Sequence, residues 1–258
     1  IPSRWAREME ATEAIEDLET LHVETPGLLN GYIHSLEEYE ELFDACLDRN
    51  LRLVNSPRDY GVAHSLELAY PDLEGMTPAT VFIDSQEQVA AAIEKMGLPA
   101  FIKGAVQSQK DKGWDACVAK TLAEAQTIVG DLLGKYQLSM GSVAIRRFIE
   151  LRHSTTVRDF PAAREFRISV FQNRALGFSR YWPECDAWQD LTADEQQTII
   201  QLAEEASRRV KVPLLVIDVA QLTNGEWIVV EIGDLQSAGL MDTDREDLAR
   251  GILNVCKK

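Results

Sequence analysis

The sequence predicts an α+β fold with antiparallel sheets, and three observations lead to that class. Helical segments alternate with pairs of strands that short turns join. This order differs from the steady strand–helix–strand order that builds a parallel sheet. Neither a GxGxxG fingerprint nor a GxxxxGK[ST] phosphate loop follows a strand. A doubly wound nucleotide-binding fold is therefore not expected.

The helices are predicted from their start signals and their apolar period. Ser35 and Glu38 have the spacing of a capping box, and apolar residues then recur on one face to about Asp48. Ser85 and Gln88 repeat that spacing before a helix that Gly97 ends. Further helices are expected over residues 122–136, 192–211 and 244–255, and residues 56–79 are expected to be loop with some helix.

Two hairpins are predicted from alternating side chains and turn residues. In Glu165–Phe171 polar and apolar residues alternate, a turn follows at 172–174, and residues 175–182 return. A second hairpin is expected around Asn224-Gly225, with strands over 214–222 and 226–232. Shorter strands are expected over 51–55, 80–83, 99–104, 116–119 and 142–151, with a mobile loop over 105–115.

The net charge excludes several classes of partner. The 258 residues include 42 Asp and Glu against 26 Lys and Arg, which gives −16. Nucleic-acid backbones and anionic membranes reward Lys and Arg, so we expect neither as a partner. No run of about 18 apolar residues is present, and no membrane span is expected.

The first residues and the cysteines also bear on what the protein is. The chain begins Ile1-Pro2-Ser3 without Met or a signal-peptide pattern, so we expect upstream sequence to be missing. The four cysteines form no CxxC pair, and only four His are present, so no zinc site is expected. We expect reduced, mostly buried thiols in a cytoplasmic protein. The cysteines are Cys46, Cys117, Cys185 and Cys256.

Charge is unevenly distributed along the chain. Residues 1–50 hold thirteen acids and three bases, whereas residues 141–180 hold eight arginines, three acids and no lysine. Arginine without lysine suits bidentate binding of carboxylate or phosphate. The alternative for most of the eight is an ordinary exposed side chain. They are Arg146, Arg147, Arg152, Arg158, Arg164, Arg167, Arg174 and Arg180.

Lys103, Arg167 and Arg180 are candidate phosphate ligands. Lys103 ends the apolar strand PAFIK, so its ammonium either is solvated at a strand end or points into a cleft. Arg167 alternates with apolar residues and shares with Glu165 the sheet face opposite the core. Arg180, on the return strand, can face the same way. Two arginines and a lysine on facing sheets suit a polyphosphate.

The last hairpin carries candidate metal ligands. Asp218 lies in the apolar strand LLVIDV, Glu231 lies in WIVVEI, and Asp234 follows three positions later. The short turn allows Asp218 and Glu231 to lie side by side, where their charges repel unless a cation or a shared proton intervenes. Oxygen ligands of this kind suit Mg²⁺ held together with phosphate. The alternative is one carboxylate paired with a nearby arginine.

Together these residues resemble the ATP-grasp enzymes. The shared pattern is a strand lysine, a flexible loop with lysine and glycine, a hinge strand, an arginine-bearing sheet and a late Asp/Glu pair. The chain resembles most closely the R-two-K clade, named for two arginines and a lysine, in its bacterial and phage branch. The matching stretches, within about residues 30–240, are RLVNSP, PAFIKG with Lys110 and Trp114, RRFIELR, EFRISVF, RYWPE and WIVVEIGDLQSAGL.

The resemblance implies an ATP-grasp fold, in which two α+β lobes with antiparallel sheets enclose a nucleotide cleft. Residues 79–258 would form this domain, with 79–147 as the first lobe and 148–258 as the second. Residues 1–78 would form an N-terminal lobe, which we expect to be a truncated pre-ATP-grasp region.

The resemblance also implies a role for each matching residue. Lys103 would contact the α-phosphate, and Lys110 would close over the phosphates. The hinge at Phe148 and Ile149 would offer backbone groups to adenine, and Glu150 would approach the ribose or the adenine rim. The remaining roles are apolar walls for Ile102, Leu215 and Ile217, γ-phosphate or acyl-phosphate contacts for Arg167 and Arg180, and Mg²⁺ binding for Asp218, Glu231 and Asp234.

Three positions depart from the usual ATP-grasp pattern. Arg147 stands before the hinge aromatic residue, where a glutamate is usual, which affects the ribose contact. The final motif is Glu231-Ile-Gly-Asp234 rather than Glu-x-Asn, so the second metal ligand is one residue late. Gly104 follows Lys103 and has no side chain to contact a substrate.

The activity implied is ADP-forming ligation with ATP and Mg²⁺. A carboxylate attacks the γ-phosphorus of ATP, and an amine or similar nucleophile, on a small molecule, peptide or protein, then displaces phosphate. Two alternatives stay open. One is an ATP-binding assembly chaperone without ligase turnover, as in the eukaryotic cell-division-cycle proteins of the clade that help assemble a translation initiation factor. The other is phosphotransfer to a protein or a small hydroxyl. The sequence does not indicate an oligomeric state.

Overall fold

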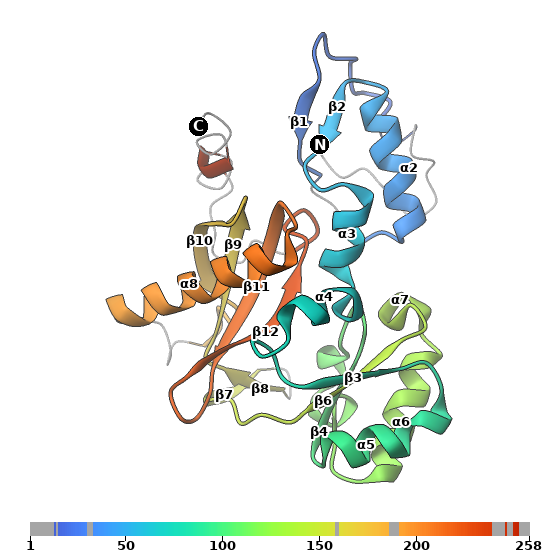
Figure 1. The fold of residues 1–258 in the computed structure, drawn as a ribbon, viewed down its shortest axis with the longest axis vertical. Coiled ribbons are helices and arrows are strands. Elements are labelled where there is room, and N and C mark those ends of the chain that lie inside the picture. Colours follow the sequence, from blue (N-terminus) through green and yellow to red (C-terminus); the bar gives the residue numbers. More distant parts are fainter. Residues whose placement is uncertain are drawn as a thin grey trace.

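A computed structural model describes residues 13, 15–29, 33–157, 160–185, 191–238, 246 and 250–252. It contains two four-stranded antiparallel sheets, one in each lobe of the predicted ATP-grasp region (Figure 1). Two two-stranded sheets complete it, and one of them lies in the N-terminal part. None of the helices in these ranges is long and apolar enough to cross a membrane.

The first lobe is a sheet covered by helices on one face. Its strand order is β3-β6-β4-β5, with β3 (Thr80–Ile83), β6 (Val143–Arg147), β4 (Ala100–Gly104) and β5 (Val118–Ala119). Apolar side chains of α5 (Val89–Met96) and α6 (Leu122–Leu133) pack on β4 and β6 in one core. The short elements of this lobe are η1 (Gln86–Gln88), η2 (Lys110–Lys112), η3 (Trp114–Ala116) and α7 (Tyr136–Ser139).

The second lobe carries the two predicted hairpins in a single sheet. Its order is β10-β9-β11-β12, with β10 (Arg174–Arg180), β9 (Glu165–Phe171), β11 (Leu214–Gln221) and β12 (Trp227–Gly233). Helices α8 (Ala193–Val210) and α4 (Leu66–Leu73) share one apolar core with this sheet. A small hairpin of β7 (His153–Val157) and β8 (Phe160–Ala163) lies beside it, toward the first lobe (Figure 1).

The N-terminal part has a core of its own. Its strands β1 (Thr25–Gly27) and β2 (Leu51–Leu53) pair in parallel, and α2 (Leu36–Leu47) packs on them. Helix α3 (Pro57–His64) then leads to α4. The buried side chain of Asn55 attaches this part to the second lobe, because its Nδ2 donates to Leu214 O at 2.8 Å and its Oδ1 accepts from Leu214 N at 3.0 Å.

Strand β11 explains why one sheet face stays polar. All eight of its residues are buried, and their side chains alternate between the two faces. Leu215, Ile217 and Val219 enter the core beneath α8. On the other face Leu214 and Val216 meet apolar residues of the N-terminal part, such as Leu28 and Val54. The next residue on that second face is Asp218. The charged residues of this face therefore begin where its contact with apolar residues of the N-terminal part ends.

Most predicted elements are confirmed, and the differences have physical causes. The Ser35 capping box is present, whereas Ser85 makes no side-chain cap bond among the described residues. There Gln88 Oε1 instead accepts from Asp84 N at 2.9 Å, and a 3-10 turn precedes α5. The strand predicted over 142–151 ends at Arg147, because the next residues leave the first sheet and bond to the end of β11.

Two predicted features fall partly on residues outside the described ranges. Of the helix expected over 244–255, residues 246 and 250–252 are described, and they are helical. Cys46, Cys117 and Cys185 are buried free thiols as expected, and Cys256 lies outside the described residues. The division into domains at 78 and 147 stays a prediction, although α4 shares the core of the second lobe.

Candidate active site

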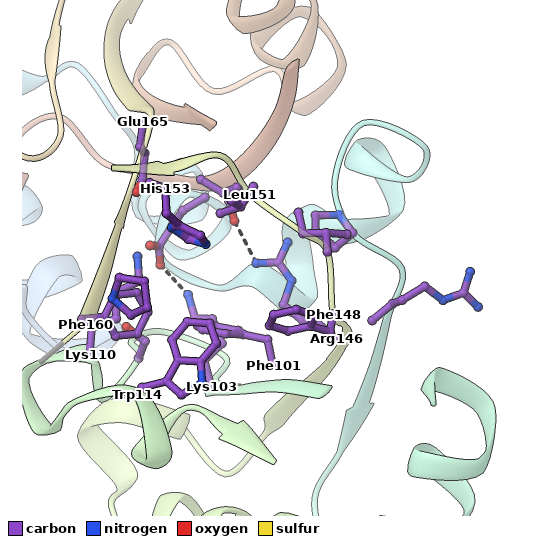
Figure 2. Close-up of a pocket in the computed structure, with 18 residues that line it drawn as sticks. Phe101, Lys103, Lys110, Trp114, Arg146, Phe148, Leu151, His153, Phe160 and Glu165 are labelled. Carbon is purple, nitrogen blue, oxygen red and sulfur yellow. Dashed lines mark hydrogen bonds and ion pairs between the residues drawn. The ribbon is translucent and has the colours of Figure 1, made fainter. Parts of the chain in front are cut away.

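A pocket lies between the two lobes, and polar and aromatic side chains from both line it (Figure 2). The first lobe contributes β4, the 108–114 loop and β6, and the second contributes β7, β8, the start of β9 and β12. The predicted hinge connects the lobes along one wall. The lining residues are Pro78, Phe101, Lys103, Ser108, Lys110, Trp114, Arg146, Arg147, Phe148, Ile149, Leu151, His153, Phe160, Pro161, Ala163, Glu165, Val230 and Glu231.

Lys103 points into this pocket rather than into solvent. Its residue is 3% exposed, and its Nζ pairs with Glu231 across the gap between the lobes. Burial lowers the pKa of Lys103, and the adjacent Glu231 carboxylate opposes that effect. Burial also disfavours the Glu231 carboxylate, but Lys103 and Lys110 outweigh it and lower its pKa to about 2. Of the two positions expected for the Lys103 ammonium, solvated at a strand end or pointing into a cleft, the structure has the second.

Gly104 has a packing reason to be glycine. A Cβ on this residue would lie 2.1 Å from the Leu138 carbonyl oxygen, which is backbone and has little room to move. The same oxygen accepts from Val106 N and Gln107 N, which holds α7 against β4. Gly104 thus lets the chain beside Lys103 pack against α7.

Arg167 and Asp218 form a bidentate ion pair on the second sheet. The two residues are register partners, with Nε to Oδ1 and Nη2 to Oδ2 distances of 2.8 Å. Asp218 is also the register partner of Glu231, as the short turn predicted. Asp218 is therefore the carboxylate that pairs with a nearby arginine, the alternative that the sequence left open. Burial would lower the pKa of Arg167, but Asp218 outweighs it and keeps the guanidinium charged.

Arg146 joins the lobes next to these pairs. It comes from β6 of the first lobe, and its Nη1 donates to Val230 O of β12 at 2.8 Å. Its Nη2 donates to Thr77 Oγ1 at 2.6 Å. Val230 is free to accept because a register shift between Asp218 and Val219 leaves it outside the regular pairing of β12. Burial lowers the pKa of Arg146 to about 10.

Lys110 reaches the same space from the loop after β4. Its Nζ lies 4.9 Å from the ring centroid of Tyr181 and 5.8 Å from that of Phe160, a cation–π arrangement. Burial would lower the pKa of Lys110, but Glu165, Glu231 and Asp218 outweigh it and raise the pKa above its ordinary value. The predicted mobile loop contains two 3-10 turns, η2 and η3.

The hinge is divided between the pocket and the surface. Phe148 and Ile149 line the pocket as the resemblance implies, and Phe148 meets Trp114 edge to face with centroids 5.9 Å apart. Glu150 has an exposed side chain, and its carbonyl accepts from Thr223 N at 3.0 Å. Arg147, where a glutamate is usual, lies at the exposed rim.

Five predicted site residues lie away from this set. Ile102 is in the first-lobe core, and Leu215 and Ile217 are in the second-lobe core, because each points to the helix-covered face of its sheet. Arg180 pairs with Phe166 rather than with Arg167, and paired residues share a face, so it lines a separate small pocket. Asp234 is fully buried and accepts from Gln236 N at 2.8 Å and Gln236 Nε2 at 3.0 Å.

Asp218 and Glu231 are the carboxylates that lie together where a metal ion is expected. Within the described ranges, no three His, Cys, Asp or Glu residues gather as a metal cluster, so Asp234 does not complete a trio with Asp218 and Glu231. The pair by itself still fits Mg²⁺, since this ion usually takes one or two carboxylates and fills its other positions with water and substrate phosphate.

Several lining residues carried no role in the sequence-based prediction. Arg146 was one of eight arginines without a distinguishing neighbour, and Glu165 was placed only by its sheet face. Phe101, Phe160 and His153 meet here only through tertiary pairing of β4, β7 and β8. Phe160 lies within the segment RDFPAAR, which shows no regular alternation of polar and apolar residues, so no local sequence pattern indicates its role.

The fold defined by these lobes is shared with solved ATP-grasp structures. A D-alanine–D-alanine ligase from Bacillus anthracis superposes with a TM-score of 0.62 at 13% identity, covering 95% of this chain and 79% of the ligase. The RimK domain protein ATP-grasp from Sphaerobacter thermophilus gives 0.56 at 17% identity, covering 83% and 72%. The ATP-grasp ligase PsnB with minimal precursor, Mg and ADP gives 0.52 at 14% identity, covering 85% and 67%. The protein therefore has the ATP-grasp fold.

The family follows from the sequence. Residues 95–252 match the model of the ATP-grasp domain of the R-two-K clade, family 3. This match spans more than half of the chain, so the chain belongs to that family. No curated protein matches the sequence.

Proposed function

We propose that the protein is an ATP- and Mg²⁺-dependent ligase that activates a carboxylate as an acyl phosphate for attack by a nucleophile. The observation that carries the proposal is the pair of ion pairs beside one pocket, Lys103–Glu231 and Arg167–Asp218. The side chains of Lys103 and Arg167 are largely buried, and each is paired with a carboxylate that could bind a metal ion instead. ATP with Mg²⁺ supplies both replacements, phosphate for the cations and metal for the carboxylates.

The role of each group follows from this exchange. When bound, Mg²⁺ would be held by Asp218 and Glu231 and would offset charge on the phosphates. Lys103, and Lys110 from the loop, would then stabilise negative charge on the phosphates, and Arg167 would face the transferred group. Phe101, Trp114 and Phe148 offer apolar surface for adenine. The chain supplies position and charge, which is what phosphoryl transfer chiefly needs.

The same fold in the D-alanine–D-alanine ligases and in PsnB supports ligation as the reaction class. The assembly chaperone and phosphotransfer remain as alternatives, and labelled ATP separates them. With γ-labelled ATP, ligation gives free phosphate, phosphotransfer gives a labelled acceptor, and a chaperone leaves ATP intact. The screen uses amino acids and short peptides as carboxylates and hydroxylamine as the trapping nucleophile. ADP and hydroxamate formed together would identify the carboxylate.

Asp218→Asn tests the charge assignment. Without one of the two carboxylates that would hold Mg²⁺, the charge on the transferred phosphoryl group is less well neutralised, so ADP release should fall by about 100-fold or more. Asp72→Asn, at an exposed position, is the matched control and should keep wild-type turnover. Thermal unfolding and circular dichroism of the same variant report whether it is folded. Wild-type turnover in a folded Asp218→Asn protein would refute the assignment.

A further inference from the structure

Glu165 is a buried carboxylate that the proposed phosphate chemistry does not use. The residue is 6% exposed, and its Oε2 accepts from Trp182 Nε1 at 3.0 Å. Its Oε1 is buried and has no hydrogen-bond partner among the described residues. Leaving a buried acceptor unpaired destabilises the protein. One oxygen is therefore fixed by the indole and the other is open to a donor from a ligand.

The open oxygen lies beside the position proposed for the phosphates. Glu165 lines the active-site pocket and also the small pocket of Arg180 and Cys185. In Figure 2 it extends from the second lobe toward the space that Lys103 and Lys110 enter from the first lobe. A ligand atom that meets Glu165 would thus be close to an acyl group activated there.

A second cavity lies on the aromatic side of the active-site pocket. It has a volume of about 290 Å³ and shares Lys110 and Phe160 with the active-site pocket. Its wall includes Trp182, the donor to Glu165. The rings of Phe160 and Tyr181 already hold the Lys110 ammonium, and the carboxylates of Asp111 and Glu184 line the same cavity. Aromatic faces with nearby carboxylates suit a cation.

We propose that the nucleophile is a primary amine that enters through this cavity as an ammonium ion, donates a hydrogen bond to Glu165 Oε1 and transfers a proton to it. The inference rests on the proposed ligase function. The neutral nitrogen attacks the acyl carbon, a C–N bond forms, and the C–O bond to phosphate breaks with its electron pair on phosphate. Of the three ammonium protons, one passes to Glu165, one stays on the amide, and one leaves with phosphate.

The charges around Glu165 favour this role. In the protein without a metal ion, burial raises the pKa of Glu165 to about 7, the charge of Lys110 opposes the rise, and the charges of Asp218 and Glu231 reinforce it. Mg²⁺ on Asp218 and Glu231 would cancel that reinforcement, and the rise from burial would remain. The hydrogen bond from Trp182 lowers the pKa. A general base works best when its pKa lies near the working pH.

Glu165→Gln tests the proposal, because the amide can still accept from Trp182 but cannot take a proton. The assay uses the carboxylate found with hydroxylamine, and methylamine, ethylamine or glycinamide as the amine. At pH 7 these amines are mostly protonated, whereas hydroxylamine is mostly neutral. We expect kcat with the amines to fall by about 100-fold or more. With hydroxylamine the loss should shrink to about 10-fold or less.

The pH profile gives an independent readout. The wild-type rate with methylamine should rise with pH as Glu165 loses its proton, and Glu165→Gln should lack that rise. Glu40→Gln, at an exposed site, is the control. Equal losses with hydroxylamine and methylamine, a change in KM alone, or a wild type that uses hydroxylamine but none of the amines would overturn the proposal. A wild type without ADP release in either arm would instead refute the ligase function.

Discussion

Asp234 shows how the surroundings of one carboxyl decide its chemistry. The resemblance implies a metal ligand here, but both oxygens accept hydrogen bonds from Gln236. Gln236 Nε2 also lies 3.0 Å from Tyr39 Oη, and its Oε1 accepts from Leu29 N at 2.9 Å. Asp234 therefore belongs to a buried polar network between the second lobe and the N-terminal part. These hydrogen bonds connect the two parts of the chain.

This network predicts a pH dependence of stability. Burial raises the pKa of Asp234 to about 6, above its value in the unfolded chain, and the Gln236 hydrogen bonds oppose the rise. The stability it contributes is fully present below about pH 4 and is lost as the pH rises through 6. Relative to Asp234→Asn, the wild-type free energy of unfolding should fall by about 2–3 kcal/mol between pH 4 and pH 7. Urea unfolding at both pH values measures it, and parallel curves would contradict it.

At the scale of single elements, β4 depends on the close approach of α7 at Gly104. Gly104→Ala puts a Cβ 2.1 Å from the Leu138 carbonyl oxygen, so the strand or α7 must shift. Such overpacking should lower the free energy of unfolding by about 1–3 kcal/mol and weaken nucleotide binding through the neighbouring Lys103. Urea unfolding and ATP titration measure the two effects.

Gly177→Ala in β10 is the matched control for Gly104→Ala. A Cβ there would meet no described atom within 4 Å, and alanine is the better strand residue by about 0.5–1 kcal/mol. We expect this variant to be at least as stable as the wild type. If both variants lost the same stability, steric contact with Leu138 would not be the cause.

The elements predicted best from the sequence are those in which polar and apolar residues alternate and a recognisable turn follows. Strand β9 has the predicted limits, and the Asn224-Gly225 turn joins β11 to β12 as predicted, although a register shift between Asp218 and Val219 is also needed to pair Asp218 with Glu231. Hairpin β7–β8 was missed because Pro161 and an arginine-rich context mask its alternation. The parallel pair β1–β2 was missed because Pro26 and Gly27 are residue types depleted in strands, and β1 forms only by pairing with a distant segment.

The site was harder to predict than the fold for a physical reason. Register and period specify which residues share a strand face, so Lys103, Arg167, Asp218 and Glu231 were all found. They do not specify which cation each carboxylate pairs with. Arg167 pairs with Asp218, and Arg180 lies on the other face, a result of strand register at the hairpin end. Arg146 and Glu165 gain their importance only from contacts between elements.

At the scale of the whole molecule, the cleft is locally balanced inside an acidic chain. The net charge of −16 is concentrated in residues 1–50, while Lys103, Lys110, Arg146 and Arg167 gather between the lobes. Two of these cations are already paired with carboxylates of the second lobe. A polyphosphate that binds here must displace Glu231 and Asp218, and the displaced carboxylates would repel it.

This competition predicts that ATP needs Mg²⁺ to stabilise the protein. With Mg²⁺ to neutralise Asp218 and Glu231, saturating ATP at about 100 times its Kd should add about 2.7 kcal/mol to the free energy of unfolding. For a chain of this size that raises Tm by about 5–10 °C. ATP with EDTA should give a clearly smaller rise, and Mg²⁺ alone a small one. Thermal unfolding in the four combinations, followed by circular dichroism, measures the effect. An equal rise with and without Mg²⁺ would mean that the carboxylates keep their arginine and lysine partners when ATP binds, and the proposed exchange of ion pairs would be wrong.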